Sequence, residues 1–223
     1  MLEDDDRAKF IFLSLLQARV GSSLVSHLGN LAPEAVLRTP VVELAGRAKI
    51  SQNAARAIEE LQRVFDPDRV QEHLAAKGIE ALTPADEAYP KVLRSIPDPP
   101  PALFVKGAVP NTPAVALVGS RKASTTGIET ARALGLALAE RGVCVVSGLA
   151  LGVDAAAHEG ALEAGGLTVG VLGCGIDIVK RQAIGRGSSC WARGMYVLRR
   201  SSDTRGLLNR RASPSDEEEA YPH

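Results

Sequence analysis

Three short apolar runs, separated by two longer stretches of mixed residues, dominate the middle of the chain. The runs are Ala114–Val118, Val143–Val146 and Thr168–Leu172. Each is nearly continuous rather than alternating, which is typical of strands that are buried on both faces of a sheet. The stretches between them, residues 126–140 and 154–164, have the length and apolar spacing of helices. The order strand, helix, strand, helix, strand predicts an α/β domain over residues 111–179 with a parallel, Rossmann-like sheet.

Residues 1–65 predict a small helical bundle. Acidic residues 4–6 can cap a first helix, Ser51 can cap a later one, and a short helix is expected between them over Ser22–Leu28. The apolar positions at helical spacing are Phe10, Leu13, Leu16 and Val20 in the first helix, and Ala54, Ile58, Leu61 and Phe65 in the later one. Leu44–Ile50 resembles one turn of a helix-hairpin-helix but lacks its second glycine, so a plain turn between helices is the favoured interpretation.

Residues 66–110 predict a connector between the helices and the sheet. Asp66, followed directly by a proline, can cap a further helix, which Gly78 then ends. Proline-rich sequence follows, and Ala102–Val105 between the prolines predicts a short strand.

The C-terminal segment, residues 180–223, differs from the rest of the chain. Residues 180–212 carry nine basic side chains and one acidic side chain, and no strand or helix period persists there. We therefore expect an incomplete sheet, with no sheet strand beyond about residue 185. The segment is interpreted either as a disordered basic tail or as sequence translated out of frame after Val179.

The whole chain carries 26 basic and 26 acidic residues among 223, so its formal net charge is zero. This balance excludes a uniformly basic nucleic-acid coat but allows a local basic site. Uncharged stretches such as residues 107–120 and 164–176 are shorter than a membrane span and contain glycine or proline. We therefore expect no membrane association. The three cysteines, Cys144, Cys174 and Cys190, are odd in number and lack metal-ligand spacing, so we expect no metal site and a reducing cytoplasmic location.

The loop after the first apolar run has the residues of a phosphate-binding site. Gly119 allows a tight turn, Ser120 and Ser124 supply hydroxyl groups, and Arg121 and Lys122 supply positive charge. The amides at the start of the following helix point to the same place. The loop matches neither a dinucleotide-binding glycine motif nor a nucleoside-triphosphate P-loop, so no cofactor is indicated. The alternative interpretation is a solvent-exposed turn with incidental charge.

The loop after the second run contributes Ser147 and Gly148 to the same predicted phosphate site, because the carboxyl ends of parallel strands share one edge of the sheet. Asp154 is predicted to cap the next helix, and His158, one turn later, to be a hydrogen-bonded structural residue. The alternative is a catalytic acid–base pair with Glu159 nearby.

Several segments together closely resemble the DNA-processing protein A family, also called DprA or Smf. The matching segments are Tyr89–Leu93, Asp98–Gly107, Pro113–Arg121, Val145–His158 and Val171–Asp177. The helical N-terminus is similar to the family's sterile-alpha-motif (SAM) or helix-hairpin-helix region, so the resemblance extends over residues 1–179. The family's later Tyr-Pro loop, further strands and Arg-Asn-Arg segment have no counterpart after Val179.

The resemblance implies a non-enzymatic protein that binds single-stranded DNA. Family members protect incoming DNA in natural transformation and load the RecA recombinase onto it, and the full-length relatives are expected to form homodimers. Gly119, Ser120 and Arg121 match the Gly-Ser-Arg loop of the family's positively charged DNA pocket. The alternatives are a nucleotide-processing enzyme on a related scaffold, using Asp154, His158 or Glu159, and an inert fragment.

Overall fold

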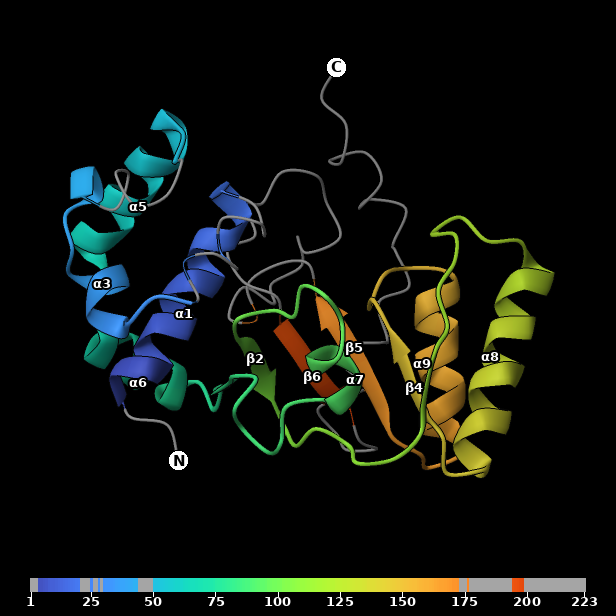
Figure 1. The fold of residues 1–223 in the computed structure, drawn as a ribbon. Helices are drawn as coiled ribbons and strands as arrows, with labels where there is room; N and C mark the ends of the chain where they lie inside the picture. The colour runs from blue at the N-terminus through green and yellow to red at the C-terminus, as the bar shows by residue number, and fades with distance from the viewer. Residues whose placement is uncertain are drawn as a thin grey trace, which may run out of the picture. The chain divides into compact units, whose positions relative to one another are not determined.

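The structure is a computed structural model that describes residues 4–20, 25, 28, 30–43, 50–172, 176 and 194–198. The chain divides into two compact units (Figure 1). The first consists mainly of residues 1–109, and the second is built around residues 110–172. Each unit is described by itself below.

The first unit begins with α1 (Asp4–Val20), α3 (Pro33–Leu37) and α5 (Gln52–Val64), which share one apolar core. Helix α6 (Pro67–Ala76) follows them and has no buried residue. The core side chains are Phe12, Leu13, Leu16, Val25, Leu28, Val36, Val41, Ala57 and Ile58. Ser51 caps α5 by accepting a hydrogen bond from the Ala54 amide at 3.2 Å, as its position predicts.

Helix α1 buries more of its surface than the predicted apolar face contains. Phe10 is partly exposed, whereas none of the four consecutive residues Ile11–Ser14 is more than 4% exposed. At about 3.6 residues per turn, four consecutive side chains point around most of the helix circumference, so a single buried face could not include them all. Helix α1 is therefore covered on more than one side, which the spacing of its apolar residues does not predict.

The rest of the first unit follows the predicted connector and adds two short elements. Asp66 caps α6 through the Arg69 amide, and Gly78, with φ +62°, follows the helix. The predicted strand is β2 (Leu103–Lys106), and it pairs antiparallel with β1 (Glu80–Leu82). Between them lies the one-turn helix α7 (Lys91–Arg94).

The second unit is the predicted parallel α/β sheet. Its elements are β3 (Ala114–Ala116), α8 (Thr125–Glu140), β4 (Cys144–Ser147), α9 (Val153–Glu163) and β5 (Thr168–Leu172). The strands lie in the order β5-β4-β3 and are parallel, with Val145 opposite Val115 on one side and Thr168 on the other. The described residues confirm the fold class, a Rossmann-like α/β sheet.

Helices α8 and α9 lie side by side and both contact β4 (Figure 1). Glycines make this approach close. A β-carbon on Gly135 would overlap the Ala157 carbonyl of α9, and one on Gly160 would overlap the Arg132 carbonyl of α8. The two helix backbones therefore touch directly, with no side chain between them at these points.

Two sequence predictions about the strands are wrong. The run over Ala114–Val118 was expected to be buried on both faces, yet all three residues of β3 are exposed. Strand β3 stands at the end of the strand order, so it lacks a neighbour on its outer side among the described residues. The apolar residues of this run correctly indicate a strand, but whether a strand is buried depends on its position in the sheet.

The second wrong prediction concerns the C-terminal segment, where β6 (Gly194–Leu198) lies next to β5 in the sheet. A strand therefore forms beyond residue 185, because the short apolar run Met195–Leu198 has strand propensity that the basic composition around it conceals. The other predictions for residues 180–223, the turn at 44–49 and most of the helix expected at Ser22–Leu28 lie outside the described residues.

Candidate functional site

The loop between β3 and α8 is shaped by two serine side chains. Ser124 is the N-cap of α8, and its hydroxyl oxygen accepts a hydrogen bond from the Gly127 amide at 3.2 Å. Ser120 holds the turn before it by accepting from the Lys122 amide at 3.1 Å. Both hydroxyl groups, predicted as phosphate donors, therefore serve first as acceptors that fix the loop backbone.

Positive charge gathers at this end of α8. Arg121 and Lys122 are both exposed and lie within the turn that precedes the helix. The amide end of a helix carries a partial positive charge, and α8 has 16 residues. Two cationic side chains and a helix N-terminus thus converge on one exposed loop, which is the arrangement that favours an anion.

The loop is locked against the start of α9. The Val153 amide donates to the Ser120 carbonyl at 3.2 Å, and a β-carbon on Gly119 would come within 2.7 Å of the Val153 side chain. Gly152 has φ +82°, and a β-carbon there would overlap the Ser120 carbonyl. A β-carbon fits at neither Gly119 nor Gly152, so the two loops pack closely against each other at these points.

The second loop carries a further unusual conformation at Leu149. This residue has φ 58° and is the one described non-glycine residue with a positive φ. Its side chain lies over Gly170 of β5, where a β-carbon would overlap it. A leucine in this conformation is strained, and the space left by Gly170 accommodates it.

Ser147 does not belong to the exposed site, contrary to the sequence prediction. It is 2% exposed, and its hydroxyl group donates to the Leu117 carbonyl at 2.6 Å. Its only proton is therefore used between two neighbouring strand segments. Gly148 is exposed, but its amide donates to the Asp154 carboxylate at 3.1 Å, so this donor is also engaged.

Asp154 has a different structural role from the one predicted. The N-cap of α9 is Gly152, which makes no side-chain hydrogen bond, and Asp154 lies within the first turn of the helix. The carboxylate is buried and holds the second loop through the Gly148 amide. The prediction of a helix cap is therefore wrong, because the helix begins earlier, at a glycine whose positive φ is not visible in the sequence.

His158 is a buried structural residue, as predicted. Its Nδ1 lies 2.7 Å from the Thr168 hydroxyl oxygen, and that hydroxyl donates its proton to the Val145 carbonyl at 2.7 Å. The imidazole must therefore donate from Nδ1, which leaves Nε2 unprotonated and without a hydrogen-bond partner among the described residues. Burial lowers the His158 pKa from 6.5 to about 4, although the negative charge of Asp154 acts in the opposite direction.

The structure therefore sorts the predicted site residues into two groups. Gly119, Ser120, Arg121, Lys122 and Ser124 lie together in one exposed loop at the N-terminus of α8. Ser147, Asp154 and His158 are buried, and each is hydrogen-bonded to another part of the second unit. Gly148 is exposed beside them.

Two other kinds of site are absent from the described residues. No group of three or more histidine, cysteine, aspartate or glutamate side chains there is arranged to hold a metal ion. No helix within the same residues has the length and apolar character needed to cross a membrane.

Comparisons with known proteins agree with one another. Residues 80–187 match the family model described as DNA recombination-mediator protein A. The chain is 38% identical to Protein Smf of Synechocystis over 121 residues, which cover 52% of this chain and 30% of the relative. It is 37% identical over 120 residues to the DNA processing protein DprA of Streptococcus pneumoniae, covering 53% of this chain and 42% of that protein.

A third relative and a solved structure extend the similarity toward the N-terminus. The DNA processing protein DprA of Bacillus subtilis is 28% identical over 177 residues, which cover 78% of this chain and 59% of the relative. The X-ray structure of Streptococcus pneumoniae DprA superposes with a TM-score of 0.55 at 25% identity, covering 87% of this chain and 67% of that chain. The chain thus spans between 30% and 59% of the length of these curated relatives.

Proposed function

Because the chain belongs to the DNA recombination-mediator protein A (DprA/Smf) family, we propose that it binds single-stranded DNA through the loop 119–124 and the N-terminus of α8. The observation that carries this proposal is the exposed Arg121–Lys122 pair on a backbone locked in place by Ser120, Ser124 and Gly152. A fixed cationic loop binds an anion without first having to be ordered.

The chemistry of the loop suits the phosphodiester backbone of DNA. An arginine guanidinium can donate two parallel hydrogen bonds to one phosphate, and a lysine adds a compact positive charge beside it. Phosphate contacts position a strand without reading its bases. We therefore expect binding that is sensitive to salt and indifferent to sequence.

The proposal extends to the process in which the protein acts. We propose that it protects incoming single-stranded DNA in natural transformation and passes it to a RecA-type recombinase in the cytoplasm. The family description, a recombination mediator, and the names of the relatives, DNA processing proteins, support this assignment.

We also propose that the protein is not a nucleotide-processing enzyme at this site. The acid–base pair that such an enzyme would need, Asp154 and His158, is buried, and each member is already hydrogen-bonded to a neighbouring element. Only Glu159 of the three residues considered is exposed. The expected result is no release of phosphate or base from nucleoside monophosphates.

The test compares two exposed arginines at opposite ends of α8. Arg121→Ala removes the proposed phosphate contact, whereas Arg141→Ala removes an arginine that bonds the Ala137 carbonyl at the C-terminal end of the helix. Fluorescence anisotropy with a labelled oligothymidylate is measured over a range of salt concentrations. Arg121→Ala should weaken binding and reduce the slope of log affinity against log salt by roughly one unit.

The control decides how a loss is interpreted. Arg141→Ala should retain both the affinity and the salt slope of the unmodified chain, because it leaves the loop untouched. Equal losses in both variants would indicate diffuse electrostatic attraction, and an unchanged Arg121→Ala slope would remove the loop from the binding site. Either result contradicts the proposal.

A further inference from the structure

Helix α1 has a second buried face that does not belong to the helical bundle. Arg7, Ile11 and Ser14 follow at intervals of four and three residues, so they lie on one side of the helix. Arg7 donates to the Ala81 carbonyl of β1 at 2.7 Å, and Ser14 donates to the Ala102 carbonyl just before β2 at 3.2 Å. Ile11 between them is 2% exposed. This face of α1 therefore rests against the β1–β2 hairpin, while Leu13 faces the bundle core.

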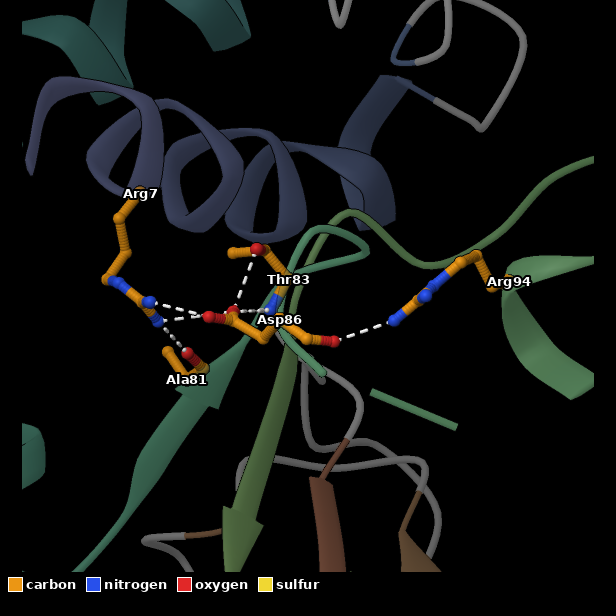
Figure 2. Close-up of polar contacts among 5 residues, drawn as sticks. All are labelled: Arg7, Ala81, Thr83, Asp86 and Arg94. Carbon is orange, nitrogen blue, oxygen red and sulfur yellow. Dashed lines mark hydrogen bonds and ion pairs between the residues drawn. The ribbon is translucent and has the colours of Figure 1, made fainter. Parts of the chain in front are cut away.

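The turn after β1 builds an acceptor for the arginine. The Asp86 carboxylate accepts hydrogen bonds from the Thr83 amide at 2.7 Å and from the Thr83 hydroxyl at 2.8 Å (Figure 2). Its main-chain carbonyl accepts from Arg94 of α7 at 2.6 Å. These contacts lie within residues 83–94 and involve no residue of α1, so the hairpin holds the carboxylate in position by itself.

Arg7 bonds to this acceptor from helix α1, although the two residues lie 79 positions apart in the sequence. Its guanidinium pairs with the Asp86 carboxylate at 2.7 Å through one nitrogen and at 3.3 Å through the other (Figure 2). The second nitrogen also makes the bond to Ala81. One planar side chain thus joins α1 to two points on the hairpin at once, and its two nitrogens pair with the two carboxylate oxygens of Asp86, which the single nitrogen of a lysine could not do.

We propose that Arg7 and Asp86 form a latch that fastens the N-terminal helical bundle to the β1–β2 hairpin, and that breaking this pair lets the bundle swing away from the hairpin while both remain folded. This proposal is independent of DNA binding. It rests on the division of contacts: the bundle has its own apolar core, the hairpin keeps Asp86 in place through Thr83, and Arg7 makes the charged link between them.

The surroundings of the Arg7–Asp86 pair favour the charged form of Asp86. Burial alone would raise the pKa of Asp86, but the hydrogen bonds from Thr83 and Arg7 outweigh it and hold the pKa below its usual value. Both partners are about one quarter exposed or less, so the pair is screened less than a surface ion pair. Without Arg7, the remaining contacts shown for Asp86 among the described residues, to Thr83 and Arg94, lie within the hairpin.

The test uses two cysteine reporters on the same helix. Ile11→Cys places a thiol on the face toward the hairpin, and Leu13→Cys places one in the bundle core. The rate of thiol labelling is followed peptide by peptide with mass spectrometry, so the natural cysteines do not interfere. A labelling rate at a buried site reports how often that site opens.

In the Arg7→Ala background, the Ile11→Cys reporter should label about tenfold faster, while the Leu13→Cys reporter keeps its rate. Asp86→Asn should have the same effect, and the double variant should label no faster than the faster single variant. Arg7→Lys should give a smaller increase in the same direction, and it keeps the test available if Arg7→Ala fails to fold.

A matched control separates the latch from any loss of an ion pair. Arg132→Ala removes an arginine–carboxylate pair in the second unit, Arg132 with Glu163 at 2.9 Å, and should change neither reporter. An unchanged Ile11→Cys rate in Arg7→Ala would overturn the latch. Equal acceleration of both reporters would overturn it as well, because the bundle would then be unfolding rather than detaching.

Discussion

His158 should make the second unit acid-sensitive well above the pH at which carboxylates protonate. In the folded chain its pKa is about 4, against 6.5 for an ordinary histidine, because the ring is buried and its Nε2 has no partner among the described residues. The unfolded chain therefore binds a proton below pH 6.5 that the folded chain refuses until about pH 4, and stability falls as the pH falls through that window. At about 1.4 kcal/mol per pH unit, the loss is about 2 kcal/mol at pH 5 and about 3 kcal/mol at pH 4.

The variant His158→Leu should be less stable than the unmodified chain at pH 7 and more stable at pH 5, so plots of their unfolding free energies against pH should cross. It removes the titrating group and the bond to Thr168, which should cost about 1 kcal/mol at pH 7. Because the variant lacks the histidine penalty, it should be more stable than the unmodified chain at pH 5. Urea unfolding of the second unit can be followed by labelling Cys144, which is 2% exposed in β4, with a disulfide reagent that reacts at acid pH.

The quantity to compare among the variants is the change in unfolding free energy between pH 7 and pH 5. Glu159→Gln changes an exposed residue one position further along α9, and it should lose as much stability between pH 7 and pH 5 as the unmodified chain does. If His158→Leu showed the same fall in stability between pH 7 and 5 as the unmodified chain, the buried histidine would not be the cause. The low pKa given to His158 would then lose its support.

Other substitutions test the loop, the helix packing and the caps. Arg121→Lys should also lose DNA affinity in the anisotropy titration, since lysine cannot make a bidentate phosphate contact. Gly160→Ala should destabilise the second unit by about 1–3 kcal/mol in thermal unfolding, because its methyl group would meet the α8 backbone. Asp154→Ala should cost about 1 kcal/mol through the unpaired Gly148 amide, with Asp154→Asn milder. Ser51→Ala should cost about 1 kcal/mol of the first unit's stability through the lost cap of α5.

The second unit was predictable because its signals are local. Predicted and observed bounds of α8, α9 and β5 differ by at most one residue. Apolar periodicity and the loop residues around each element are enough to place it. The same local signals recovered α6 and β2 in the first unit.

What escaped prediction depends on contacts between distant segments. Strand β1 and helix α7 have three and four residues, too few for a period to be visible. The direction of the Ser147 side chain follows from its register beside Leu117, and the role of Asp154 follows from a loop that folds back onto it. Neither property is encoded by spacing along the chain.

In the candidate loop, the structure shows that the charged residues Arg121 and Lys122 are exposed, and it gives the hydroxyl groups a different role from the predicted one. Its hydroxyl groups were expected to meet a ligand, whereas both brace the backbone. Serine serves either purpose equally well, so residue type alone could not distinguish them.

The backbone contact between Gly152 and the carbonyl of Ser120 separates the loop's shape from its chemistry. The path of the loop is fixed at Gly119 and Gly152, where no β-carbon fits, and by the bond from the Val153 amide to the Ser120 carbonyl, while the side chains of Arg121 and Lys122 are exposed. Length changes in either loop would break the interlock, but exchanges at positions 121 and 122 would leave it intact. The two positions therefore form a surface whose ligand preference can be rewritten, by design or by drift, without refolding the scaffold beneath.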